Sequence, residues 1–329
     1  MLELMLLGQP VNREATIREV PQLGTIGYPL SYGNFTGIHA NYLYSMHNGT
    51  GKMYRALLDA DVSALNWALY STPSPAVGYR GLGYNTANFS EYSMLWYMAS
   101  VIGGVTKPAL TWYKVAEKTQ TAFDYPQMPG GATALTGHQQ VHARKRLYMW
   151  GGRRASNLDE LMNVYFFHYM GLEGGFVSDA TQWDWKPPLI ANAVVAADPE
   201  ENYLYSFGGE LIGSSTSVTT DRAFKYSLDT GVWQEIATMP HPLRITGAVT
   251  IGKYIYMLSG LTANALTSAS RTVVRYNIDT DRYDVFPLPG DWDAEYGATA
   301  FTVNGKLYSM FGWNNTNGRM CTKIYELSF

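Results

Sequence analysis

The sequence predicts an all-β protein, a six-bladed β-propeller in which each blade is a sheet of four antiparallel strands. Three observations predict this fold class. Residues 193–242 contain four short runs of β-branched and aromatic residues, separated by turn residues and without a helical period. Aromatic residues recur along the chain every 51 to 57 residues. Six copies of about 52 residues nearly fill the 329 residues, so one domain accounts for the chain.

The stretch 193–242 defines the repeating unit most clearly. A turn at Asp198–Asn202 separates its first two strands, and the tight turn Asp229-Thr230-Gly231 separates its last two. An isolated sheet with two apolar faces is unstable in water, so the unit needs similar sheets on both sides. The four expected strands are 193–197, 203–207, 223–228 and 232–240.

Three independent series of aromatic residues share one period. The second strands give Tyr44, Tyr97, Tyr148, Tyr205, Tyr256 and Tyr308. The third strands give Tyr54, Tyr113, Tyr165, Tyr226, Tyr276 and Tyr325. The fourth strands give Trp67, Phe123, Trp183, Trp233 and Tyr283, each followed by a proline. Because the three series agree, the repeat is a far stronger signal than one motif.

The unit resembles the kelch repeat, in which an apolar strand ends in Gly-Gly and is followed by a Tyr and then a Trp. Gly208-Gly209, Tyr226 and Trp233 match this pattern, and Gly151-Gly152 matches its first part. The corresponding pairs elsewhere are His47-Asn48, Ser259-Gly260 and Phe311-Gly312. The resemblance, which extends to galactose-oxidase-like propellers, implies a kelch-like β-propeller and does not by itself imply an activity.

The two ends of the chain predict how the ring closes. Residues 323–329 read as a third strand with nothing after it, whereas residues 14–22 read as a fourth strand. We expect the N-terminal strand to complete the last blade, which leaves no open edge and gives six blades. The predicted organisation is an N-terminal arm at 1–12 and a propeller at 13–329.

The copies differ in regularity along the chain. The first two, about 25–76 and 77–130, are least regular, and their first strands are expected within 33–37 and 81–86. The third, about 131–190, has a polar first strand at 138–142. The last three copies have short turns after their first strands.

Loop lengths point to one face of the predicted ring. Loops between second and third strands lie on the same face as the connections between blades, and four of them are long. Such loops are expected to bind a partner. The alternative explanation is that these loops became long without a function, because loops tolerate insertions. The long loops are 151–163, 210–222, 261–271 and 313–321.

The candidate ligand-binding residues lie on this face. Aromatic rings flanked by amides and carboxylates are suited to sugars, whose C–H faces stack while hydroxyls form hydrogen bonds. The proposed residues are Trp313, Asn314, Asn315, Arg319 and Trp292. Six arginines on this face could together hold a carboxylate, or each could pair with a local acid. They are Arg153, Arg154, Arg222, Arg244, Arg271 and Arg319.

Motifs for catalysis are absent from the sequence, which has no Gly-x-Ser-x-Gly, phosphate loop or His-Glu-x-x-His. His138 and His142 share a strand face without a third ligand, so no metal and no cofactor are expected. The copper oxidases of this fold need a Cys–Tyr crosslink, and the only cysteine, Cys321, lies in a loop. Kelch-like sialate mutarotases remain the enzymatic alternative.

Composition excludes several other classes. The net charge of −3 gives no field that would recruit nucleic acid. The apolar stretch at residues 1–7 lacks the flanks of a signal peptide, and no run is long enough to span a membrane. A virion or the cytoplasm is the expected location.

The favoured function is a non-enzymatic binding or assembly module that recognises a protein partner or a surface glycan. Its Gly-, Thr-, Asn- and Ala-rich loops resemble those of bacteriophage attachment or decoration proteins. The alternatives are a sugar-acid mutarotase or isomerase and a cellular kelch adaptor. The apolar arm either folds back on its own propeller or anchors it to a neighbouring subunit. The arm residues are Leu2, Leu4, Met5, Leu6 and Leu7.

Overall fold

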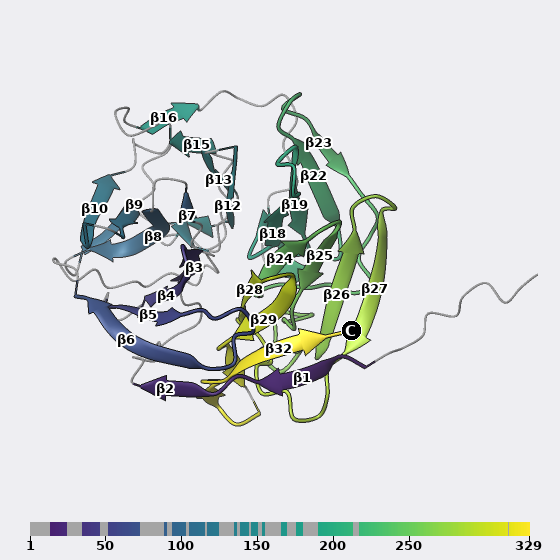
Figure 1. The fold of residues 1–329 in the computed structure, drawn as a ribbon. Coiled ribbons are helices and arrows are strands. Elements are labelled where there is room, and N and C mark those ends of the chain that lie inside the picture. Colours follow the sequence, from purple (N-terminus) through teal and green to yellow (C-terminus); the bar gives the residue numbers. More distant parts are fainter. Residues whose placement is uncertain are drawn as a thin grey trace, which may run out of the picture.

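A computed structural model of the chain confirms the all-β class, because its described residues form strands and turns and contain no helix (Figure 1). Within these residues, then, no helix is long and apolar enough to cross a membrane. The described residues are 14–24, 35–46, 52–72, 89–90, 94–102, 105–115, 117–124, 135–136, 139–144, 146–150, 153–154, 166–169, 176–179, 190–212, 217–314 and 316–329.

The last three copies form regular four-stranded antiparallel sheets. The fourth copy contains β18 (Val194–Ala197), β19 (Tyr203–Phe207), β22 (Ala223–Ser227) and β23 (Trp233–Glu235). The fifth contains β24 (Ala248–Ile251), β25 (Tyr254–Met257), β26 (Thr272–Asn277) and β27 (Arg282–Pro287). The last contains β28 (Thr299–Val303), β29 (Lys306–Met310) and β32 (Ile324–Ser328), and its fourth strand is β1 (Thr16–Glu19).

The first two copies also form sheets of this kind. The first contains β3 (Phe35–His39), β4 (Tyr42–Met46), β5 (Met53–Leu57) and β6 (Leu65–Ser71), with β2 (Gln22–Gly24) added at its edge. The second contains β7 (Phe89–Ser90), β8 (Met94–Ile102), β9 (Val105–Lys114) and β10 (Thr119–Asp124). Its paired first strand therefore follows the expected stretch 81–86, which lies outside the described residues.

The third copy is described only as separate strand pairs. Its expected aromatic markers Tyr165 and Trp183 lie outside the described residues. The pairs are β11 (Leu135–Thr136) with β14 (Arg153–Arg154), β12 (Gln139–Ala143) with β13 (Arg146–Trp150), and β15 (Phe166–Tyr169) with β16 (Phe176–Asp179).

The sheets are arranged as in a β-propeller, in which the first strand of each blade lies nearest the common axis. First strands of consecutive sheets contact one another: β3 contacts β7, β12 contacts β18, β18 contacts β24, and β24 contacts β28. Figure 1 shows the labelled sheets following one another in sequence order. A single short strand carries only a weak periodic signal in the sequence. Contacts between neighbouring sheets fix how these strands are arranged.

The N-terminal segment pairs with the last sheet, as the sequence predicted. Strand β1 runs antiparallel to β32, with Thr16 opposite Ser328 and Glu19 opposite Tyr325. The expected strand 14–22 is shorter than predicted, because the chain then leaves this sheet at Pro21. The Pro21 carbonyl accepts a hydrogen bond from the Leu65 amide at 2.9 Å, and β2 pairs in parallel with β6 of the first sheet.

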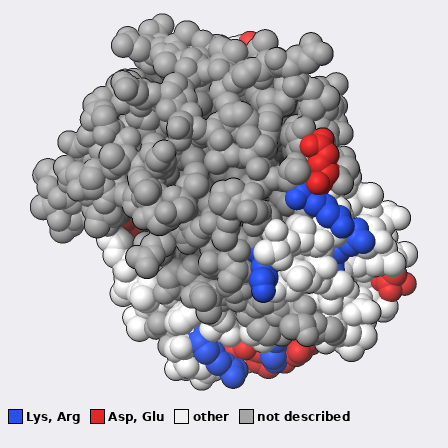
Figure 2. Space-filling model, turned by 90° about the vertical axis from the view of Figure 1, so that its left-hand side faces the viewer, with Lys and Arg blue, Asp and Glu red and all other residues white. Residues whose placement is uncertain are grey.

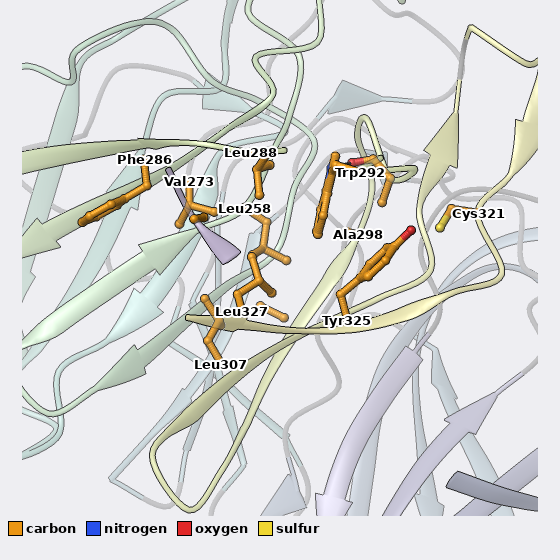
Figure 3. Close-up of a cluster of buried hydrophobic side chains, with 13 residues drawn as sticks. Leu258, Val273, Phe286, Leu288, Trp292, Ala298, Leu307, Cys321, Tyr325 and Leu327 are labelled. Atoms are coloured by element: carbon orange, nitrogen blue, oxygen red, sulfur yellow. Dashed lines mark hydrogen bonds between the residues drawn. The ribbon is translucent and has the colours of Figure 1, made fainter. Parts of the chain in front are cut away.

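The core is formed between the sheets. One cluster joins the fifth and last sheets and includes Leu258, Val273, Trp292 and Tyr325, as Figure 3 shows. Further clusters join the last sheet to the first, the fourth to the fifth, and the third to the fourth. Second strands such as β19 and β29 are buried along nearly their whole length, whereas the outer strand β6 begins with alternating buried and exposed residues.

Candidate functional site

From the third copy to the last, the connection that enters each sheet pairs with the long loop of that sheet, which places both on the predicted loop face. In the fourth copy, β17 (Ile190–Ala191) pairs with β20 (Glu210–Ile212). Single antiparallel bridges join Arg244 to Leu261 and Tyr296 to Trp313 in the next two copies. The pair β11–β14 does the same in the third copy. We call these connections and loops the loop face.

Two of the long loops are β-hairpins rather than irregular segments. In the fourth copy, β20 pairs with β21 (Ser217–Thr219). In the last copy, β30 (Trp313–Asn314) pairs with β31 (Arg319–Met320). Backbone pairing gives these loops a fixed shape that sequence composition alone did not predict, because their Ser, Thr and Asn residues also fit an irregular loop.

Neighbouring loops are also joined sideways by a buried arginine. The Arg244 guanidinium forms an ion pair with Glu210 of the preceding copy, and both side chains are buried. Arg244 also donates to the carbonyls of Ala263 and Asn264, at 3.1 and 3.0 Å. A buried ion pair needs such additional hydrogen bonds to offset the cost of desolvation. Arg244 is therefore a structural residue of this face.

Two further contacts extend these ties across the face. The Thr219 hydroxyl donates to the Asn264 side-chain oxygen at 3.3 Å, joining the loops of the fourth and fifth copies. The buried Ser259 hydroxyl donates to the Glu295 carbonyl at 2.6 Å, joining the fifth copy to the last connection. The described loops of three consecutive copies thus form one continuous rim.

A polar pocket of about 350 Å³ opens on this face, beside the last sheet. Its walls come from the connection before β28, from the β30–β31 hairpin, and from single residues before β26 and β32. It brings together three of the predicted site residues, Trp292, Asn314 and Arg319. The lining residues are Arg271, Gly290, Asp291, Trp292, Asp293, Glu295, Asn314, Thr316, Asn317, Arg319 and Lys323.

The acidic wall of this pocket comes from one short segment, residues 291–295. Residues 292, 294 and 296 are the buried Trp, Ala and Tyr, with 2%, 0% and 1% exposure. The intervening Asp291, Asp293 and Glu295 line the pocket. Trp292 also borders the pocket, and Glu295 is itself only 6% exposed, so the apolar and acidic side chains of this segment lie close together.

The acidic wall holds the β30–β31 hairpin in place. The Asn314 amide donates to Asp293 at 2.6 Å, and the Thr316 hydroxyl donates to Glu295 at 2.6 Å. The Asn314 oxygen in turn accepts a hydrogen bond from the Asn317 backbone amide at 2.7 Å. Asn314 is therefore a buried positioning residue, and its polar atoms are used within the protein.

The cations of the pocket are engaged to different degrees. Arg271 donates to the backbone carbonyls of Pro289, Gly290 and Trp292, at 3.1, 3.1 and 3.3 Å. Arg319 is 63% exposed and lies 3.5 Å from Asp293. A hydrogen bond to Glu19, 3.1 Å away, raises the pKa of Lys323. Three acids and three bases line the pocket, so its formal charge is zero.

The structure places the predicted site residues in different environments. The Trp292 ring is buried and packs on Tyr325, with 4.9 Å between ring centroids, so it is not the exposed stacking surface that was expected (Figure 3). Trp313 is partly buried against Ile245, Leu261 and Tyr296. Asn315 and the arm residues Leu2, Leu4, Met5, Leu6 and Leu7 lie outside the described residues.

The arginines do not form one ring. Arg222 pairs with Glu235 at 2.8 Å and Arg244 pairs with Glu210, as the local-pairing alternative predicted. Of the four arginines whose side chains are described, Arg271 and Arg319 line the pocket. The described side chains of both charge signs lie near one another on the side seen in Figure 2.

The residues predicted from the sequence did not include most of the pocket lining, among it Glu295, Thr316 and Lys323. The alternation of acidic and apolar residues at 291–296 was the available signal for Glu295. Thr316 and Lys323 gave no such signal, because their positions depend on the hairpin and on the pairing of β1. Among the described residues, no group of three or more His, Cys, Asp or Glu could hold a metal ion.

Comparison with known proteins supports the kelch resemblance. No family model matches the chain. The chain is similar to kelch-like protein 15 of Danio rerio, at 28% identity over 143 residues, which cover 42% of this chain and 23% of that protein. Kelch-like protein 15 of Homo sapiens is 24% identical over the same coverage. The match thus spans about a quarter of the length of these curated relatives.

Proposed function

We propose that the chain is a non-enzymatic binding module, a six-bladed kelch-like propeller spanning residues 13–329 that binds a protein partner through its loop face. The observation that carries this proposal is the continuous rim, in which loops of three copies are joined by Arg244, Thr219 and Ser259. A surface whose loops are already ordered loses less conformational entropy when a partner binds. The similarity to kelch-like protein 15 supports the same class of function.

Two exposed apolar side chains mark where a protein partner would make contact. Val218 and Leu266 are 59% and 46% exposed, and they lie on the loops that Thr219 and Asn264 join. Burial of apolar side chains near the centre of an interface supplies much of its binding energy. Their exposure on an ordered rim therefore favours a protein ligand here.

The test replaces both rim residues with aspartate in the full chain. We expect Val218→Asp with Leu266→Asp to lose at least about tenfold in partner affinity, because a charge would enter an apolar contact. The matched control is Val232→Asp, which is 52% exposed in the turn between β22 and β23 on the opposite face. The measurements are capture of the native partner and thermal melting. Equal capture of the partner by the unaltered chain, the double variant and the Val232→Asp control would refute the proposal.

The biological setting has two candidates, each with its own support. A bacteriophage attachment or decoration protein fits the Gly-, Thr-, Asn- and Ala-rich loops. A cellular kelch adaptor fits the similarity to kelch-like protein 15. Co-sedimentation with virus particles would support the first, and recovery in a cellular complex would support the second.

We also propose that the apolar arm, residues 1–12, anchors the propeller to a neighbouring subunit. The described chain begins beside the outer end of β27, where the Ala15 amide donates to the Pro287 carbonyl at 2.9 Å. The proposed anchor would therefore act next to β27, the fourth strand of the fifth sheet.

A further inference from the structure

We propose that the pocket lined by Asp291, Arg271 and Arg319 binds a neutral polyhydroxyl ligand, such as one sugar unit of a glycan. This inference deepens the proposed function, because it rests on the loop face being a binding surface and names a second ligand class for it. The pocket volume of about 350 Å³ is in the range that small-molecule sites occupy.

The argument begins with the polar groups that the fold leaves unused. Asp291 is exposed, and it has no hydrogen bond or ion pair with any residue that the structure describes. The Arg319 side chain is 63% exposed, and its one ion pair with a described residue is the 3.5 Å contact to Asp293. Arg271 binds three backbone carbonyls through one nitrogen, Nη2, which leaves donors on its other nitrogens. The pocket therefore offers an acceptor and several donors together.

Charge balance then selects the class of ligand. Three acids and three bases line the pocket. A charged ligand is therefore attracted by one set of side chains and repelled by the other. An apolar ligand would desolvate these groups without replacing their hydrogen bonds. A hydroxyl both donates and accepts, so neighbouring hydroxyls can donate to Asp291 and accept from Arg271 or Arg319. A neutral polyol satisfies both walls.

Rigid support makes these contacts effective. Asp293 and Glu295 are held by Asn314 and Thr316 of the β30–β31 hairpin, at 2.6 Å each. The buried Trp292 fixes the segment that carries Asp291, since its indole N–H donates to the Ala294 carbonyl. Because the Trp292 ring is buried, recognition depends on hydrogen bonds rather than on stacking, and an affinity on the order of millimolar is expected.

The experiment titrates the full chain with methyl glucoside, methyl galactoside and methyl mannoside, and separately with glucuronate, by protein NMR. We expect saturable binding of at least one neutral hexoside, weaker binding of glucuronate, and chemical-shift changes at residues 290–293 and 316–319. Asp291→Asn should weaken the hexoside about tenfold, because it removes a charged acceptor. The matched control Asp279→Asn, 61% exposed in the β26–β27 turn of the opposite face, should bind normally.

The outcomes separate this inference from the proposed function. Absence of saturable hexoside binding would overturn it, as would tighter binding of glucuronate or an unchanged affinity in Asp291→Asn. Capture of the protein partner should be the same for Asp291→Asn and the unaltered chain, because Val218 and Leu266 lie in loops of other copies. Loss of partner capture in the Val218 and Leu266 variant, with hexoside binding intact, would leave both proposals standing.

Discussion

At the scale of single residues, the Gly-Gly motif has a steric cause. Gly208 and Gly209 both adopt positive φ angles, of 60° and 90°. A Cβ atom at Gly208 would lie 2.1 Å from the Leu243 carbonyl oxygen, and one at Gly209 would lie 2.4 Å from the Ile190 side chain. The pair is needed because the chain turns into its long loop while packed against the neighbouring connection.

Two alanine substitutions separate the steric clash from the backbone conformation. Gly208 and Gly252 have similar φ angles, 60° and 53°, but a Cβ at Gly252 meets no atom within 4 Å. We expect Gly252→Ala to cost about 1 kcal/mol of unfolding free energy, from the left-handed conformation alone. Gly208→Ala should cost at least about 2 kcal/mol more, because the clash is with backbone. Chemical denaturation measures both, and equal losses would contradict the clash.

The sequence predicted the burial of one tryptophan, Trp233, but not that of another, Trp292. Trp233 was expected to pack in a blade, and it is 2% exposed against Trp150 and Tyr226. Trp292 was proposed as a sugar-binding ring because aspartates flank it, yet it is buried to the same degree. The flanking acids did not predict the environment of the ring, because Asp291 is exposed whereas Trp292 and Glu295 are both buried.

At the scale of strands, the aromatic series predicted the positions of the strands well. Tyr44, Tyr205 and Tyr256 lie on second strands, and each faces a cation on the third strand: Arg55, Lys225 and Arg275. The parallel pairing of β2 with β6 was not predictable, because a three-residue strand has no periodic signal. The hairpins of the loop face were missed for the same reason.

The seam between β1 and β32 depends on ionised side chains. Arg18 on β1 forms an ion pair with Glu326 on β32, and its guanidinium also donates to the carbonyl of Asp61 at 3.2 Å. Desolvation raises the pKa of Glu326, but the Arg18 hydrogen bond and the charges of Arg18 and Lys306 outweigh it and lower this pKa. The carboxylate is thus more acidic in the folded chain than in the unfolded one.

This difference predicts a dependence of stability on pH. Because the folded pKa is the lower one, the stabilisation is present above the unfolded value of 4.5 and is lost as the pH falls through the folded pKa. We expect the melting temperature of the unaltered chain to fall more between pH 6 and about pH 3 than that of Glu326→Gln. The control Glu200→Gln replaces an exposed residue with no ion pair in the described chain. Parallel curves for Glu326→Gln and the unaltered chain would refute the assignment.

At the scale of the whole molecule, the N-terminal segment joins three sheets. Its Ala15 amide binds the Pro287 carbonyl of the fifth sheet, β1 completes the last sheet, and β2 extends the first sheet. Ala15 and Val20 are each 1% exposed, so the segment also enters the core. The last and first sheets are formed by the most distant parts of the chain, and this segment pairs with both.

Two truncations test the roles of this segment and of the arm. Deleting residues 1–22 removes β1 and most of the bridge, which exposes the edge of β32 and uncovers buried apolar groups. We expect this chain to melt at a lower temperature and to aggregate, because an open strand edge pairs with other chains. Deleting residues 1–12 should leave the melting temperature unchanged, because every described contact of the segment is kept. Melting of both truncations like the full chain would refute the closure. If the shorter deletion folds but no longer enters the native assembly, the arm is the anchor; if it folds and assembles normally, the anchor proposal fails.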